Sequence, residues 1–94
     1  MEAQNAGTMF DKPILDLNGN PIDKERTAGQ ILAEILVRGY SSDEEEILQM
    51  QEWAETLNSG KELKIKASEK ARLREIIVRS EVTVLVKAAL LKML

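Results

Sequence analysis

The chain has 94 residues, of which 44% are hydrophobic and 31% are charged, a balance that fits one small globular domain. Cysteine and histidine are both absent, which excludes disulfides, a thiol nucleophile, a histidine general base and the usual structural zinc site. The net charge of −3 hides a polarity: residues 1–60 carry 12 acidic and 4 basic residues, whereas residues 61–94 carry 4 acidic and 9 basic residues. Halves of opposite charge favour attraction within one chain or between chains. Binding of nucleic acid by the basic half is the alternative.

The first residues are mostly polar, and their few apolar residues recur at neither helical nor strand spacing. Residues 1–12 are therefore predicted to form a flexible tail, and residues 13–94 a single domain. The segment PILDLNGNPI at residues 13–22 predicts a small hairpin or an extended arm, because Asn18-Gly19 suits a tight turn. Pro21 lacks an amide hydrogen, so the second half of this arm must be an edge or end there.

Residues 27–38 predict the first helix. Thr27 and Gln30 are spaced as a capping box. Apolar residues then recur at helical spacing, namely Ile31, Leu32, Ile35 and Leu36. We expect Gly39 to end this helix in the left-handed conformation. Gly29 in the first turn costs about 1 kcal/mol relative to alanine unless close packing requires it.

Residues 42–60 predict a second helix of the same kind. Ser42 is the expected N-cap with Glu45 as its partner, and the acidic run at residues 43–46 suits the positive end of the helix dipole. One face of this helix is apolar, and it consists of Ile47, Met50, Trp53, Ala54 and Leu57. Trp53 is expected to anchor the core, with a partner-binding hot spot as the alternative.

The alternation in KELKIK at residues 61–66 predicts a short strand or extended link that could pair with residues 14–17. Ser68 is then expected to cap a third helix, whose apolar side is formed by Leu73, Ile76 and Ile77. Ser80 is the expected cap of a fourth helix that begins at Glu81. These elements predict a mainly α fold with a minor β part: a small helical domain of about four helices, a short N-terminal hairpin or arm, and a short strand near residues 61–66.

Residues 82–94, VTVLVKAALLKML, contain ten apolar residues. The start alternates like a strand, but six positions from Val82 to Met93 follow helical spacing, so a helix is favoured. The segment is too short to span a bilayer. A helix that is apolar on nearly all sides must be enclosed by other protein. We therefore expect a protein partner or a second copy on this helix, with contact residues Leu85, Leu90, Leu91 and Met93.

The alternative function is nucleic-acid binding by the basic segment at residues 61–79, because phosphate contact needs clustered cations. The candidate residues are Lys64, Lys66, Lys70, Arg72 and Arg74. Reading or stacking of bases also uses aromatic side chains, and residues 61–94 contain none. No phosphate loop or buried carboxylate pair is indicated, so the chain is not expected to be an enzyme, and no cofactor or metal is expected.

The order of segments resembles small phage and prophage proteins, which combine an LDG-P arm, a helix, a helix–turn–strand unit and an LTVLVKA-type C-terminal helix. The matching segments are residues 16–22, 27–36, 53–65 and 82–94. The resemblance implies a phage-type protein in the host cytoplasm, and it carries no assigned activity. Together with the apolar C-terminal helix, it favours a non-enzymatic interaction protein that forms a homo-oligomer and inhibits a host or defence component.

Overall fold

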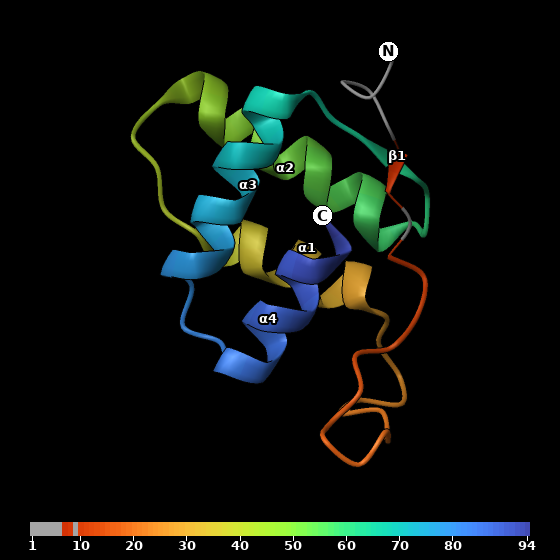
Figure 1. Ribbon diagram of the computed structural model, residues 1–94. Coiled ribbons are helices and arrows are strands. Elements are labelled where there is room, and N and C mark those ends of the chain that lie inside the picture. The colour runs from red at the N-terminus through yellow and green to blue at the C-terminus, as the bar shows by residue number, and fades with distance from the viewer. Residues whose placement is uncertain (1–6, 9) are drawn as a thin grey trace.

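The computed structural model describes residues 7, 8 and 10–94, and it is mainly helical, as the sequence predicts (Figure 1). The described helices are α1 (Ala28–Arg38), α2 (Glu44–Asn58), α3 (Ala67–Arg79) and α4 (Val84–Met93), and the short strands are β1 (Gly7–Thr8) and β2 (Leu63–Lys64). Within the described residues, no helix is long and apolar enough to cross a membrane.

The predicted capping box at the start of α1 is confirmed. The Gln30 amide donates to Thr27 Oγ1 at 3.2 Å, and the Thr27 amide donates to Gln30 Oε1 at 3.0 Å. The end of α1 differs from the prediction, because Gly39 is extended (φ −73°, ψ 168°) rather than left-handed. A Cβ at Gly39 would lie 2.8 Å from Met50 Cε, the end of a flexible side chain that can shift, and 3.4 Å from the Leu36 carbonyl oxygen, so neither a positive φ nor fixed packing requires glycine here.

Close packing explains Gly29. A Cβ at this position would lie 3.0 Å from Phe10 Cβ and 3.2 Å from the Leu57 carbonyl oxygen. The Gly29 amide donates to the Phe10 carbonyl oxygen at 2.9 Å. The segment before the arm, the start of α1 and the end of α2 therefore contact one another at Gly29, where the absence of a side chain leaves room for all three.

The N-caps of the other helices differ from the predictions. Asp43, not Ser42, caps α2 by accepting from the Glu45 amide at 3.1 Å. At α3 the N-cap position is Lys66 rather than Ser68, and its amide donates to the Glu69 carboxylate at 2.9 Å. Several polar residues stand near each helix start, so the capping rule locates each start to within one or two residues but does not fix the N-cap residue.

The fourth helix begins later than predicted. Thr83, not Ser80, is its N-cap, and the first helical residue is Val84 rather than Glu81. Ser80 instead ends α3, where its hydroxyl donates to the Ile77 carbonyl oxygen at 2.6 Å. The prediction that the C-terminal segment is a helix rather than a strand is confirmed for most of its length.

Part of the predicted tail belongs to the folded domain. β1 pairs antiparallel with β2, with Gly7 opposite Lys64 and Thr8 opposite Leu63. Phe10 is buried in the core, and the Ala28 amide donates to the Lys12 carbonyl oxygen at 2.8 Å. The predicted pairing of residues 61–66 with residues 14–17 is therefore wrong, because an earlier segment takes that edge. Residues 1–6 and 9 of the predicted tail lie outside the described residues.

The arm at residues 13–22 forms as predicted and extends from the helices (Figure 1). Leu15 forms a bridge with Pro21, and Gly19 adopts a positive φ of 84° in the turn between them. The Asp16 carboxylate accepts from the amides of Asn18 and Asn20, at 2.8 and 2.9 Å. The carboxylate therefore fixes the turn as an Asx-type structure, which agrees with the tight turn predicted at Asn18-Gly19.

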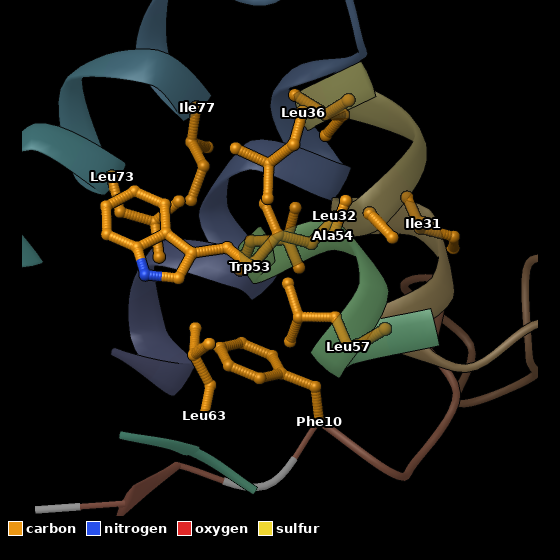
Figure 2. Close-up of a cluster of buried hydrophobic side chains, with 14 of the residues drawn as sticks. Phe10, Ile31, Leu32, Leu36, Trp53, Ala54, Leu57, Leu63, Leu73 and Ile77 are labelled. Atoms are coloured by element: carbon orange, nitrogen blue, oxygen red, sulfur yellow. The ribbon is translucent and has the colours of Figure 1, made fainter. Parts of the chain in front are cut away.

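The core is aliphatic and lies where the four helices converge. Figure 2 shows Trp53 of α2 reaching toward Leu73 and Ile77 of α3, and Phe10 lying near Leu63. All described buried residues of the core are apolar, and no described buried side-chain nitrogen or oxygen lacks a partner. The predicted role of Trp53 as a core anchor is confirmed.

Candidate protein-binding surface

The C-terminal helix α4 is covered mainly by its own chain. Leu90 is fully buried, and Leu85, Leu91 and Met93 are partly buried against the core. Val84, in the first turn, is the exposed large apolar side chain of this helix, at 81% exposure. Leu90 is thus unavailable to a partner of the folded chain, and the other three predicted contact residues are available only in part.

Side chains of α3 and α4 join the two helices along their length. The Lys87 ammonium donates to the Val78 carbonyl oxygen at 2.8 Å, and Arg74 Nη1 donates to the Leu91 carbonyl oxygen at 3.3 Å. These contacts hold α3 beside α4, and the apolar residues of α4 are covered by packing against the core. Trp53, the fifth predicted contact residue, is also buried, so the hot-spot alternative does not apply to the folded chain.

The five predicted nucleic-acid residues do not all point in the same direction. Lys64 and Lys66 are exposed on and after β2, and Lys70 is half-buried on α3. Arg72 and Arg74 stand two positions apart, so they point to opposite sides of α3. Arg72 Nη1 lies 3.6 Å from Glu46 Oε2 of α2, whereas Arg74 turns toward α4.

The two oppositely charged halves make one ion pair between described residues, the Arg72–Glu46 pair. The other ion pairs stay within one half, and they are Arg26–Asp23, Arg26–Glu34, Arg38–Glu34 and Arg79–Glu75. Attraction between the halves therefore contributes little inside this chain, since single exposed pairs typically contribute below about 1 kcal/mol.

The outward side of α1 carries a network of charges. Arg26, just before the helix, places Nε 2.7 Å from Asp23 Oδ2 and Nη1 2.9 Å from Glu34 Oε2. The hydrogen bond from Arg26 holds the pKa of Asp23 below its usual value, and the bonds to both carboxylates raise the pKa of Arg26. The Arg26 and Glu34 side chains remain 40% and 43% exposed. The pair is hydrogen-bonded within the chain but still reachable by another molecule.

A first hollow of about 410 Å³ lies between α1 and α2. Its lining residues follow helical spacing on both helices, and they are Glu25, Arg26, Gln30, Ala33, Glu34, Val37, Gln51, Ala54 and Asn58. Two small residues, Ala33 and Ala54, are buried at its base. Val37 on its rim is 54% exposed, although it belongs to a helix with a well-covered apolar face.

A second hollow of about 250 Å³ lies on the other side of the same charged residues, between the arm, α1 and the start of α4. Its lining is largely aliphatic, and it consists of Ile22, Arg26, Ile31, Glu34, Ile35, Glu81, Val82, Thr83 and Val86. Ile22 of the arm is 41% exposed. Arg26 and Glu34 line both hollows, so their ion pair forms the ridge between them. We call the ridge and the two hollows the α1 face.

The α1 face was not predicted from the sequence. Its one local signal is Val37, an apolar residue that falls outside the apolar stripe of its helix. Ile22 could not be singled out, because its neighbours in space come from α1 and α4. Within the described residues, no cluster of three acidic side chains is placed to hold a metal ion. Comparisons with known protein families, curated proteins and solved structures find no match to this chain.

Proposed function

We propose that this chain is a non-enzymatic interaction protein that binds another protein chain through the α1 face. The observation that carries this proposal is the combination of exposed aliphatic side chains, Ile22 and Val37, with two hollows around a hydrogen-bonded ion pair. Protein interfaces typically combine apolar contact residues with arginine and with a polar surround. Apolar side chains gathered beside a hollow are more typical of a binding site than apolar side chains scattered singly over a surface.

The hydrogen-bonded ridge supports the same proposal. Arg26 is held by two carboxylates, so its side chain loses less freedom when a partner arrives than an unpaired arginine would. The nucleic-acid alternative has weaker support, because Arg72 and Arg74 point to different sides of α3. The resemblance to phage proteins extends the proposal to an inhibitor of a host or defence component that acts in the host cytoplasm.

Affinity capture from the native host, followed by mass spectrometry, tests the proposal. The tagged wild-type chain is compared with Ile22→Asp/Val37→Asp, which places two charges at the hollows. The matched control is Val78→Asp, because Val78 is 55% exposed on α3, outside the residues that line either hollow. Circular dichroism confirms that all three chains are folded.

The expected result is a protein retained by the wild type and by Val78→Asp but lost with the double variant. Two outcomes contradict the proposal. One is equal retention by all three chains, and the other is a wild-type chain that retains no protein and also does not bind itself.

A further inference from the structure

We propose that one side of α3, continued by a lysine of α4, binds the phosphate backbone of a nucleic-acid duplex. The residues concerned are Lys66, Lys70, Arg74 and Lys87, which we call the basic stripe. This inference goes beyond the proposed function, because no residue of the basic stripe lines either hollow of the α1 face. The basic stripe keeps three of the residues expected from the sequence and adds one from α4.

The two remaining arginines of α3 already have carboxylate partners. Arg72 Nη1 lies 3.6 Å from Glu46 Oε2 of α2, and Arg79 Nη2 lies 3.3 Å from Glu75 Oε2 of α3 itself. A phosphate that approached either arginine would also meet the negative charge of its carboxylate partner, and like charges held close together weaken association. These two arginines are therefore excluded from the basic stripe.

The basic stripe begins with three cations at four-residue spacing. Lys66, Lys70 and Arg74 follow one line along α3, with a rise of about 6 Å between neighbours. Their side chains make no ion pair within the part of the chain that the structure describes. The nearby carboxylate of Glu69 accepts instead from the Lys66 backbone amide and from Gln49 Nε2 of α2, both at 2.9 Å.

Lys87 of α4 continues the basic stripe by one more step. Its ammonium donates to the Val78 carbonyl oxygen at 2.8 Å, so it lies beside the position four residues after Arg74. Arg74 Nη1 donates in turn to the Leu91 carbonyl oxygen at 3.3 Å. Each of these bonds uses one N–H group, whereas an arginine has five and a lysine three. Both cations are thus positioned between α3 and α4 with donors left for another acceptor, which lowers the entropy lost on binding.

The length of the basic stripe suits the charge density of a duplex. Three steps of four residues span about 18 Å, and a duplex carries one phosphate charge per about 1.7 Å of its axis. Four cations along this line can therefore contact phosphates at the same time. A protein surface carries its carboxylates more sparsely, with both signs of charge interspersed, so it matches four aligned cations less well.

The basic stripe contains no side chain that stacks on bases. Residues 61–94 have no aromatic residue, and single strands are typically held by stacking on aromatic side chains. We therefore expect a duplex to be bound through its phosphates, with little dependence on base sequence. Neutralisation of four phosphates predicts that the logarithm of the binding constant falls with the logarithm of the salt concentration, with a slope of about −3.5.

Fluorescence anisotropy with a labelled duplex of about 20 base pairs tests the proposal. The wild type is expected to bind with a dissociation constant on the order of 10 µM at about 50 mM salt. Lys66→Gln/Lys70→Gln should weaken binding about tenfold and reduce the magnitude of the salt slope by about two. The matched control, Arg72→Gln/Arg79→Gln, removes the same charge from α3 outside the basic stripe and should bind like the wild type. Circular dichroism confirms that both variants are folded.

Duplex DNA and duplex RNA share the phosphate chemistry, so both are titrated, and polyglutamate stands in for an acidic protein partner. Binding of either duplex that is weakened by the stripe variant and not by the control supports the proposal, and the two titrations show which nucleic acid is held more tightly. Three outcomes overturn it: no binding of either duplex at about 100 µM chain, a control variant that weakens binding as much as the stripe variant, or tighter binding of polyglutamate than of both duplexes.

Discussion

The helix α4 and the outward side of α1 show opposite relations between sequence and exposure. α4 is the most apolar segment of the chain, yet α3 and the core cover most of it. α1 has a clear apolar stripe and a charged outer side, yet that outer side retains two hollows and exposed Val37. Apolar composition therefore does not identify a binding surface, because exposure depends on which other elements the fold brings to each helix.

The largest expected effect tests the burial of α4. Leu90→Ala should lower the free energy of unfolding by about 3 kcal/mol, since it leaves a cavity in a fully buried site. The control Val84→Ala, on the same helix, should change it by less than about 0.5 kcal/mol. Urea denaturation measures both variants. Equal, small effects would mean that α4 is not enclosed by its own chain.

A second expected effect compares the two sides of α1. Alanine in place of glycine normally favours a helix by about 1 kcal/mol, but Gly29→Ala should destabilise this chain by about 1–2 kcal/mol, because its Cβ would press against Phe10 and the Leu57 carbonyl. The control Val37→Ala, on the outward side, should change stability by less than about 0.5 kcal/mol. If Gly29→Ala stabilised the chain instead, the space beside Gly29 would be larger than these distances indicate.

The smallest expected effect concerns the ridge of the α1 face. The hydrogen bond from Arg26, then the one from the Glu25 amide, lowers the pKa of Asp23 below 3.8 in the folded chain. Because the folded pKa is lower, ionised Asp23 stabilises the fold above the unfolded pKa, and this contribution is lost as pH falls through the folded pKa. NMR titration should place the Asp23 midpoint below 3.8, and Arg26→Gln should raise it. An unchanged midpoint in that variant would assign the shift to another group.

Local patterns predict the elements of this fold well where one signal dominates. The Thr27 box, the helical period of α1 and the turn at Gly19 all form as their residues indicate. The predictions fail where several residues compete or where distant segments meet. Ser80 has the chemistry of an N-cap, but the structure uses it to end α3. The strand partner of β2 could not be chosen from alternation alone, since β1 has only two residues.

The candidate site was less predictable than the fold for a physical reason. Leu90 and Trp53 have the side chains typical of interface anchors, and the same side chains are typical of cores. Only the tertiary packing, which places both side chains in the core of their own chain, decides between the two roles. The α1 face depends on Ile22 and Val82 lining the same hollow, and no sequence period relates positions so far apart.

The pairing of β1 with β2 also sets an order of events during synthesis on the ribosome. Gly7 and Thr8 emerge more than fifty residues before their partners Leu63 and Lys64. Phe10 likewise cannot complete its packing until the end of α2 has been synthesised, because the Leu57 backbone lies beside Phe10 and Gly29 in the folded chain. Closing so long a loop carries an entropic cost that later contacts must offset. Gly7, Thr8 and Phe10 are therefore fixed in place only after much of the later chain has been made, and until then a strand edge and an aromatic side chain stay exposed to the surroundings of the nascent chain.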